Sequence, residues 1–356
     1  MSMRVLVAMS GGVDSSVAAA LLAEAGHDVI GVSMQLYDQR HGDVQFGTCC
    51  TIDDLHDARR VAAALGFPHY IVNLEREFEQ EVVADFVREY AAGRTPIPCV
   101  HCNGQLKFAT LVERARGFGA AHVATGHYAR VTFDEAQGRY QLRRGLDGTK
   151  DQSYFLFSLT QAQLAAAAFP VGGLTKAAVR EHARRLGLRV ADKPDSQEIC
   201  FVPTGDHASF VERRAPESAT AGVLVDRAGR VVGRHGGVHH FTVGQRKGLG
   251  LASVEPLYVL SLDARDQKVT VGPREALERT TCTASRVNWI AGDPPLGPRR
   301  VAAQIRYRHR EAPAYVRALD DRRVSVEFDE PQAAIAPGQA VVFYEGDAVT
   351  GGGWID

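Results

Sequence analysis

The sequence of 356 residues lacks any apolar run approaching the roughly 18 residues that a helix needs to cross a bilayer. Its start, Met1–Arg4, leads directly into a short apolar run and lacks the order of a signal peptide, so we expect a cytoplasmic protein with no membrane partner. Neither sign of charge is in excess, since the formal net charge is -1. A nucleic-acid partner would therefore bind through local basic patches, because there is no overall positive field.

Cysteine is also scarce, and six residues in a cytoplasmic chain of this length do not suggest a disulfide framework. Their clustering instead suggests reactivity or metal binding. An isolated cysteine, Cys282, is expected to pack as a small apolar side chain. The adjacent pair Cys49-Cys50 could be structural or functional. The six are Cys49, Cys50, Cys99, Cys102, Cys200 and Cys282.

The chain changes character twice along its length. Up to about residue 204, strand-like runs such as Arg4–Met9 alternate with helical stretches such as Asp14–Ala25. This alternation predicts an α/β domain with a doubly wound parallel sheet. Later segments are short, punctuated by glycine and alternately polar and apolar, with a strand expected at Ala303–Arg308. They predict a small, mostly β central domain and an all-β C-terminal barrel. We place the domains at residues 1–204, 205–277 and 278–356.

The most specific motif is Ser10-Gly11-Gly12-Val13-Asp14-Ser15-Ser16, between the first expected strand and helix. Glycines let the backbone approach an anion, and a helix start offers unpaired N–H groups. The motif lacks the lysine of G-x-x-x-x-G-K-[ST] and the third glycine of a dinucleotide fingerprint. It resembles the PP-loop of ATP pyrophosphatases, which implies cleavage of ATP to AMP and pyrophosphate. Asp14 would orient the loop or help to hold Mg²⁺. The implied ATP contacts are Ala8, Met9, Ser10, Gly11, Gly12, Val13, Asp14 and Ser15.

A C-x-x-C pair, Cys99 and Cys102, follows Pro96 and Pro98. We expect the two prolines to make this segment an ordered loop and not a helix. An isolated C-x-x-C is most often a zinc site or a redox pair. His101 or Cys200 could complete a zinc site, although Cys200 alone could also be a buried small side chain.

Six stretches resemble, in order along the chain, the bacterial tRNA-specific 2-thiouridylases. They are Gly93–Asn103, Thr125–Arg130, Lys150–Leu156, Asp195–Phe201, Gly244–Gly250 and Gly351–Ile355. The resemblance implies an enzyme that transfers sulfur to C2 of the wobble uridine in the tRNAs for Lys, Glu and Gln. Adenylation of the C2 oxygen by ATP would make AMP the leaving group when sulfur attacks.

The resemblance also implies roles for individual residues. Cys200 would carry a persulfide received from a sulfur-carrier protein, Cys102 would act as the nucleophile, and a Cys102–Cys200 disulfide would be the natural product. For His127 we expect a protonation state that can be tuned near neutral pH. The further ATP contacts would be Met34 and Gly126, the target base would meet Ile97, Pro98 and Cys99, and tRNA would meet His127, Lys150, Asp151, Gln152, Arg306, Tyr307 and Gln339.

One departure from the family leaves the sulfur chemistry open. Many members carry Asp where this chain has Cys99, and Asn where it has Ile97. The extra thiol makes Cys99, Cys102 and Cys200 three soft ligands, enough to hold a [4Fe-4S] cluster with one iron open to hydrosulfide. A persulfide relay and a cluster-bound sulfide are therefore both possible from the sequence.

The densest basic and aromatic cluster is Arg306–Arg310. Arginine binds phosphates and tyrosine stacks on unpaired bases, although a strand with alternating, solvated arginines is the alternative. Two other functions remain open for the whole chain. A small-molecule adenylating PP-loop synthetase would not need Cys102 or Cys200, and a zinc-stabilised RNA-binding module would not turn over ATP. We expect a monomer.

Overall fold

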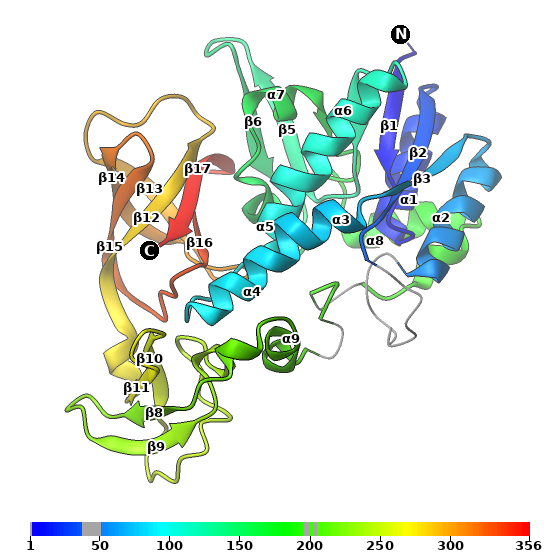
Figure 1. Cartoon of the computed structure of the whole chain (residues 1–356). Coiled ribbons are helices and arrows are strands. Elements are labelled where there is room, and N and C mark those ends of the chain that lie inside the picture. Colours follow the sequence, from blue (N-terminus) through cyan, green and yellow to red (C-terminus); the bar gives the residue numbers. More distant parts are fainter. Residues whose placement is uncertain (1, 38–50, 196–198, 203–204) are drawn as a thin grey trace. The chain divides into compact units, whose positions relative to one another are not determined.

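The computed structural model describes residues 2–37, 51–195, 199–202 and 205–356, so Cys49 and Cys50 lie outside the described residues. The chain forms two compact units, and Figure 1 labels most of their helices and strands. Unit 1 comprises residues 1–82, 99–205 and 347–349, and unit 2 comprises residues 83–98, 206–346 and 350–356. No helix in the described part of the chain has both the length and the apolar character needed to cross a membrane.

Unit 1 is built on a five-stranded sheet in which every neighbouring pair is parallel. The strands are β1 (Arg4–Ala8), β2 (Asp28–Gln35), β3 (His69–Asn73), β4 (His122–Ala124) and β7 (Ala167–Ala168), in the order β3-β2-β1-β4-β7. The chain runs outward from β1 to β3 and then returns to β4 on the other side of β1. The strand order therefore reverses between β1 and β4, which is where a doubly wound sheet binds its ligand.

Helices cover both faces of this sheet, which confirms the predicted α/β fold. Val5 and Val7 of β1 share one apolar cluster with residues of α1, α2 and α8. Leu6 is fully buried but points to the opposite face, where α6 contacts β1 and β4. The further elements that lie wholly or mostly in unit 1 are α1 (Val13–Glu24), α2 (Ile52–Leu65), α3 (Glu75–Phe78), η1 (Glu79–Val83), α5 (Pro98–His101), η2 (Cys102–Phe108), α6 (Ala109–Gly117), the hairpin β5 (Ala129–Asp134) and β6 (Arg139–Arg144), η3 (Ser153–Leu156), α7 (Gln161–Ala166), α8 (Lys176–Arg185) and η4 (Arg189–Asp192).

The segment around the C-x-x-C pair is helical, so the predicted loop is wrong. Pro98 is the first residue of α5, and the helix continues through η2 into α6. Proline suits this position because its φ angle is already helical and its missing N–H would have had no partner within the helix. Cys99 and Cys102 therefore lie in the opening turns of one helical segment.

Unit 2 contains a small four-stranded sheet in the order β10-β11-β8-β9. Leu224, Val259 and Val269 are central to its apolar core. Its elements are α9 (His207–Arg214), η5 (Pro216–Ser218), β8 (Gly222–Val225), β9 (Val231–His235), η6 (Val238–His240), β10 (Tyr258–Asp263), β11 (Lys268–Gly272) and η7 (Arg274–Leu277).

Helix α4 (Ala84–Ala91) packs with this part of unit 2. The ring of Phe86 meets Phe210 edge-on at 5.9 Å between centroids, and Tyr90 stacks on His207 at 4.5 Å. Residues 83–98 thus fold with unit 2 although they precede residue 204. The domain limits along the sequence stay predictions.

The C-terminal strands close into a barrel, as predicted. They are β12 (Glu278–Trp289), β13 (Arg299–Gln304), β14 (Ala312–Asp320), β15 (Arg323–Ala333), β16 (Ala340–Glu345) and β17 (Ala348–Ile355). The order is β12-β15-β14-β13-β16-β17, and the additional pairing of β12 with β17 completes the ring. The predicted strand Ala303–Arg308 is wrong at its end, because β13 stops at Gln304 and Arg308 has a φ of 61°. The cluster Arg306–Arg310 therefore lies in a turn, and the alternative of arginines alternating along a strand is also wrong.

Candidate nucleotide and sulfur-transfer site

The PP-loop lies at the carboxyl end of β1 and is shaped by its own side chains. Ser15 Oγ accepts a hydrogen bond from the Ser10 N–H at 3.1 Å, and Ser16 Oγ donates to the Gly12 carbonyl at 2.8 Å. Gly12 is the N-cap residue of α1 and provides no capping side chain. The first N–H groups of α1 thus suit an anionic ligand.

Two glycines allow this loop to sit where it does. Gly11 has a φ of 74°, and a Cβ atom there would lie 2.1 Å from the carbonyl oxygen of Asp54. Gly126 follows β4, and a Cβ atom there would lie 2.5 Å from the Ser15 nitrogen and 2.7 Å from the Asp14 carbonyl carbon. The backbone after β4 is therefore in direct contact with the loop.

The predicted ATP contacts gather at one edge of the parallel sheet. Ala8 ends β1, Met34 lies one residue before the end of β2, and Gly126 lies two residues beyond β4. Met34 is buried, so its backbone and not its side chain is the part available to a base. The structure brings these residues to the β1/β4 switch point, and their contacts with ATP stay predictions.

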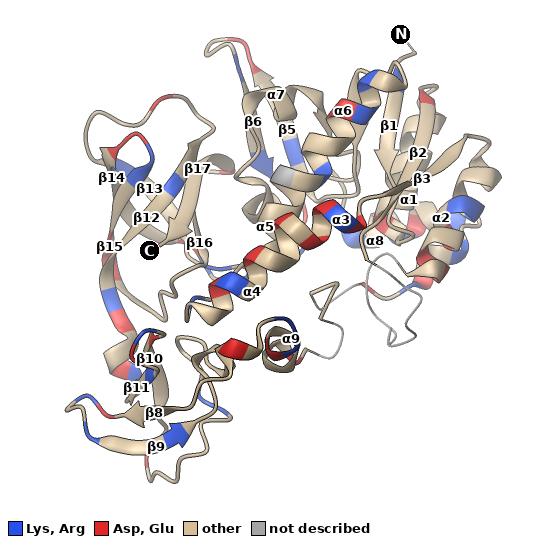
Figure 2. Cartoon of the chain, viewed as in Figure 1, with Lys and Arg blue, Asp and Glu red and all other residues tan. Residues whose placement is uncertain are grey.

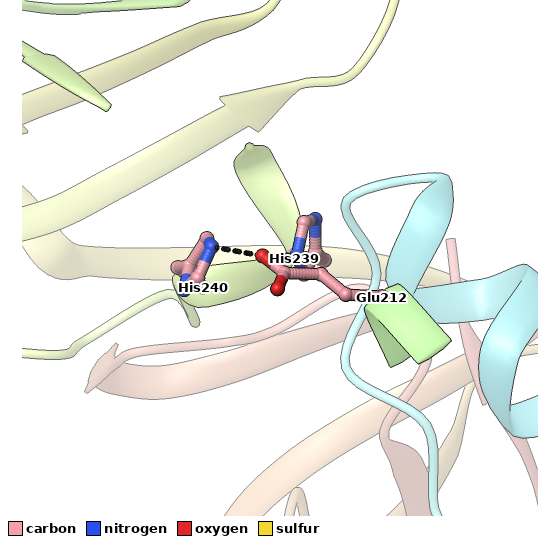
Figure 3. Close-up of side chains that lie close together, drawn as sticks. All are labelled: Glu212, His239 and His240. Carbon is pink, nitrogen blue, oxygen red and sulfur yellow. Dashed lines mark hydrogen bonds and ion pairs between the residues drawn. The ribbon is translucent and has the colours of Figure 1, made fainter. Parts of the chain in front are cut away.

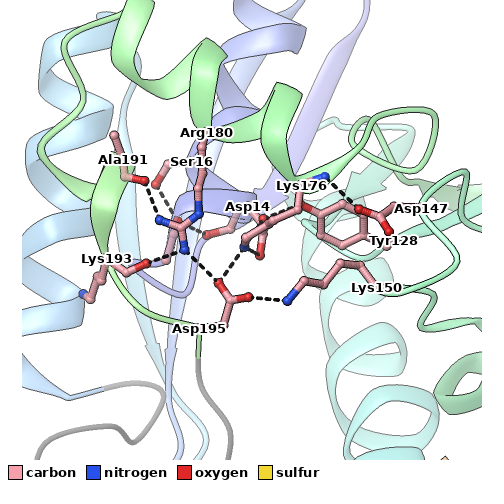
Figure 4. Close-up of polar contacts among 12 residues, drawn as sticks. Asp14, Ser16, Tyr128, Asp147, Lys150, Lys176, Arg180, Ala191, Lys193 and Asp195 are labelled. Atoms are coloured by element: carbon pink, nitrogen blue, oxygen red, sulfur yellow. Dashed lines mark hydrogen bonds and ion pairs between the residues drawn. The ribbon is translucent and has the colours of Figure 1, made fainter. Parts of the chain in front are cut away.

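Asp14 is held by two residues that the sequence reasoning missed (Figure 4). Lys176 Nζ lies 2.8 Å from both carboxylate oxygens of Asp14, and the Tyr128 hydroxyl donates to Oδ1 at 2.7 Å. Burial first, and then the neighbouring Asp14 charge, raise the pKa of Tyr128, so this hydroxyl stays a donor. Lys176 is the first residue of α8, where a positive charge is unfavourable because it opposes the helix dipole. A lysine at the start of a predicted helix is therefore the sequence signal that could have identified Lys176 as a functional residue.

The same lysine links Asp14 to Asp195. Lys176 Nζ lies 2.7 Å from Asp195 Oδ1, and Lys150 Nζ lies 2.7 Å from Asp195 Oδ2. Burial by itself would raise the pKa of Asp195, but the hydrogen bonds from Lys150 and Lys176 lower it overall. Because the Lys176 side chain is only 12% exposed, its ammonium group is confined between the two carboxylates.

A second missed lysine, Lys193, lies against the other side of the loop. Its Nζ donates to the Gly11 carbonyl at 3.1 Å and to carboxylates of Asp54 and Asp57 at 2.6 and 2.8 Å. Burial opposes its charge, but the two carboxylates raise the pKa of Lys193 overall. Two fixed ammonium groups, on Lys176 and Lys193, therefore accompany the phosphate loop.

The three candidate sulfur-chemistry cysteines all belong to unit 1. Cys99 is exposed in the first turn of the helical segment, and Cys102 is buried in the next turn. Cys200 is partly buried, and the adjacent Phe201 packs edge-on against Phe78 at 5.5 Å between centroids.

A zinc site at the C-x-x-C pair would bring its ligand atoms close together. Among the described residues, Cys99, His101, Cys102 and Cys200 provide no group of three ligand atoms within 4.8 Å of one another, so the compact zinc site is not found there. A [4Fe-4S] cluster spreads its thiolates more widely, so this observation bears on zinc alone. Burial, followed by the charge of Asp356, raises the pKa of Cys282 to about 12, in keeping with an inert packed thiol.

His127 is neutral near physiological pH, so the expected tuning of its protonation there is wrong. Its ring lies 6.4 Å from the Phe108 ring and 6.1 Å from the Phe169 ring, centroid to centroid. Burial, with the charge of Lys107 second, lowers the pKa of His127 to about 3. Nδ1 is 2.7 Å from Thr125 Oγ1, so the imidazole is a fixed neutral group of the β4 turn.

The predicted tRNA contacts at Lys150, Asp151 and Gln152 make internal bonds. Asp151 is 8% exposed, and its carboxylate accepts hydrogen bonds from the backbone N–H groups of Gly145 and Ser153 at 3.0 and 3.1 Å. The Gln152 side chain accepts from the Tyr128 N–H at 3.0 Å. These side chains hold the loop beside the β4 turn, and their contact with tRNA stays a prediction.

In unit 2 the structure brings Gln339 to the predicted target-base segment. Gln339 Nε2 donates to the Thr95 carbonyl at 3.1 Å, and the Thr95 N–H donates to the Pro337 carbonyl at 2.8 Å. These bonds fix the backbone that leads into Ile97 and Pro98, both of which are buried. Gln339 therefore acts on this segment from the barrel.

The basic cluster after β13 is also partly organised. Arg306 Nη1 donates to the Ala333 carbonyl at 3.1 Å, and the Arg308 guanidinium lies 5.5 Å from the centre of the Tyr307 ring. Arg306 and Tyr307 remain the predicted contacts for phosphate and base.

Figure 2 shows both signs of charge interspersed along α2 and α4, so positive charge is not gathered on those helices.

Comparison with known proteins covers nearly the whole chain. Residues 3–204 match the family described as tRNA methyl transferase HUP domain. Residues 208–273 match the family described as tRNA methyl transferase PRC-barrel domain, and residues 279–355 match the family described as Aminomethyltransferase beta-barrel domain. The tRNA-specific 2-thiouridylase MnmA of Geotalea uraniireducens is 55% identical over 357 residues, covering 99% of this chain and 95% of that protein. The protein of the same name from Solibacter usitatus is 54% identical over 366 residues, covering 99% of each. With such identity along its length, the chain belongs to the tRNA-specific 2-thiouridylase family.

Proposed function

We propose that the protein is an ATP-dependent tRNA sulfurtransferase that converts the wobble uridine of the tRNAs for Lys, Glu and Gln to 2-thiouridine. The observation that carries the proposal is the presence, in one unit, of a PP-loop at the sheet's switch point and of Cys99, Cys102 and Cys200. The family relationship supports the same activity, because relatives that match over 95% and 99% of their own length are named for it.

The phosphate loop suits the adenylation step. The unpaired N–H groups at the start of α1 would bind the phosphates, and Lys176 and Lys193 would offset their charge. Asp14 would release Lys176 and bind Mg²⁺ instead, because Mg²⁺ prefers carboxylate oxygens as ligands. The charge of the ion would stabilise the departing pyrophosphate. The uridine C2 oxygen would attack the α-phosphate, forming an adenylated base and releasing pyrophosphate.

Sulfur would then replace the adenylate. A donor protein would leave a persulfide on Cys200, and the Cys102 thiolate would attack the inner sulfur of that persulfide. This step would form a Cys102–Cys200 disulfide and release hydrosulfide, which would attack C2 and expel AMP. A thiol reductant would return both cysteines to their starting state.

Cys99 supports a second way of holding the sulfur. With Cys102 and Cys200 it supplies three thiolates, the number that leaves one iron of a [4Fe-4S] cluster open to hydrosulfide. The cluster would replace the persulfide and leave the adenylation step unchanged. Anaerobic purification with iron analysis separates the two, because a colourless, iron-free and fully active protein would rule out the cluster.

Recognition of tRNA would use side chains of residues 97–99 and of the basic cluster after β13. Arg306 would bind a backbone phosphate and Tyr307 would stack on a base, while the segment Ile97–Cys99 would meet the uridine after it leaves its stack. The bonds from Gln339 to Thr95 support this assignment, because they fix the backbone just before that segment.

Thiolation of unmodified tRNA in vitro, with ATP and a persulfide source but no added sulfide, tests the function. We expect Cys200→Ser to lose 2-thiouridine formation and the matched control Cys282→Ser to keep it, since both side chains are partly buried. Asp14→Ala should lose adenylation but retain tRNA binding. Formation of AMP without any tRNA would favour a small-molecule synthetase, and the absence of any ATP turnover would favour an RNA-binding module.

A further inference from the structure

Three metal-ligating atoms come together in unit 2, away from the cysteines (Figure 3). Glu212 lies in α9, and His239 and His240 lie in η6. Glu212 Oε1 is 3.2 Å from His239 Nε2 and 2.9 Å from His240 Nε2. All three ligand atoms lie within 4.8 Å of one another, and no other group of three in the described part of the chain does so.

These separations match those around a small divalent ion. Zinc binds nitrogen and carboxylate oxygen at about 2.0–2.2 Å, which places neighbouring ligands about 3–3.5 Å apart in a tetrahedral or octahedral arrangement. The oxygen–nitrogen distances of 3.2 and 2.9 Å are already in or close to that range. Two of the three separations therefore already suit an ion, and the third, between the two imidazole nitrogens, is within 4.8 Å.

The residue types and the burial also fit a metal site. A neutral imidazole and a carboxylate are the ligand forms that zinc requires. The His239 side chain is fully buried, so its Nε2 is held in a fixed place 3.2 Å from the Glu212 carboxylate.

The other ring nitrogen of His239, Nδ1, also favours a metal ion at Nε2. Its buried Nδ1 makes no well-formed hydrogen bond, although the Ser218 carbonyl interacts with the ring. An ion at Nε2 would fix the proton on Nδ1 and direct it to that carbonyl, as metal-bound histidines commonly do. Metal binding would thus strengthen a contact of a buried polar atom that is poorly formed in the protein alone.

We propose that Glu212, His239 and His240 form a zinc-binding site that joins α9 to η6 in unit 2. Two imidazoles and one carboxylate favour zinc over the calcium or magnesium that all-oxygen sites select. The side chains of His240 and Glu212 are 38% and 36% exposed, so an ion can enter and water can complete its coordination. Because α9 and η6 both pack on α4, the site would stabilise the interior of unit 2.

Zinc titration of the full-length protein tests the site. Zinc bound at equilibrium would be measured by competition with a coloured chelator for wild type, Glu212→Gln and His240→Ala, with circular dichroism to check that each variant is folded. We expect the variants to lose one equivalent of zinc, or to bind it at least about tenfold more weakly. The thermal midpoint of wild type should rise on addition of zinc and that of the variants should not.

A matched control is His56→Ala, which removes an exposed histidine of α2 in unit 1. It should leave the stoichiometry unchanged. Cobalt spectra distinguish this site from zinc held by thiols, because ligation by nitrogen and oxygen gives no thiolate charge-transfer band. Identical zinc binding by wild type, Glu212→Gln and His240→Ala would overturn the proposal, whether or not the protein thiolates tRNA.

Discussion

Replacement of Gly126 by alanine should disable the nucleotide site while leaving the protein folded. The new Cβ would lie 2.5 Å from the Ser15 nitrogen, 2.7 Å from the Asp14 carbonyl carbon and 2.9 Å from the Ser15 Cα. All three atoms are backbone, so no side-chain rotation can relieve the overlap. Either the PP-loop or the turn after β4 must move.

The size of the effect follows from that overlap. Ordinary contact begins near 3.4 Å, so the Ser15 nitrogen must retreat by about 0.9 Å. Overpacking of this kind costs about 1–3 kcal/mol, which is smaller than the 5–15 kcal/mol that stabilises a typical domain. A displacement of about 1 Å in a reacting group can reduce the rate by about 100-fold. We therefore expect a folded protein with about 100-fold less ATP turnover.

The assay is the tRNA-dependent release of AMP and pyrophosphate, followed over a range of ATP concentrations. Gly117→Ala is the matched control, because Gly117 ends α6 and a Cβ there would meet nothing within 4 Å. Thermal unfolding of both variants separates a displaced loop from a lost fold. A Gly126→Ala protein with the wild-type rate and the wild-type KM for ATP would refute the assignment of this edge as the nucleotide site.

Three further predictions concern charge, protonation and iron. Lys176→Met should reduce ATP turnover by about 100-fold, since it removes the cation held between Asp14 and Asp195, and an unchanged rate would show that this lysine has no role in adenylation. His127, with a pKa of about 3 in the folded protein against the ordinary 6.5, should contribute no inflection to the rate profile between pH 5 and 8. Because the unfolded chain then binds the extra proton, the free energy of unfolding should fall as the pH drops from 6.5 towards 3, and less steeply in His127→Gln. Cys99→Ser should abolish any bound iron if the cluster is present and should leave sulfur transfer intact if a persulfide is used, which iron analysis and 2-thiouridine formation measure together.

Local features of the sequence predicted the α/β and barrel folds and the place of the phosphate loop. The glycines, serines and aspartate of residues 10–16 require a strand before them and a helix after them, and both are present. The apolar periodicities identified β1 and α1 to within one residue at each end. Prediction failed at Pro98, because proline ends some helices and begins others, and only its contacts decide which.

The polar surroundings of the loop could not be predicted in the same way. Lys176, Lys193 and Asp195 lie more than 150 residues after Asp14, and no local pattern specifies which carboxylate each lysine will meet. The packing of α4 on α9 could not be predicted either. The sequence of an amphipathic helix identifies its apolar face, but it does not identify the element that packs on that face.

The sequence alone therefore determined the motifs, the order of strands and helices, and the types of residue available for chemistry. The tertiary structure decided which of those residues meet, because long-range contacts depend on the register of whole strands and the packing of whole helices. That is why Ser10–Ser16 could be recognised from the sequence as a phosphate loop, whereas the lysines beside it and the group Glu212, His239 and His240 became visible only in the folded chain.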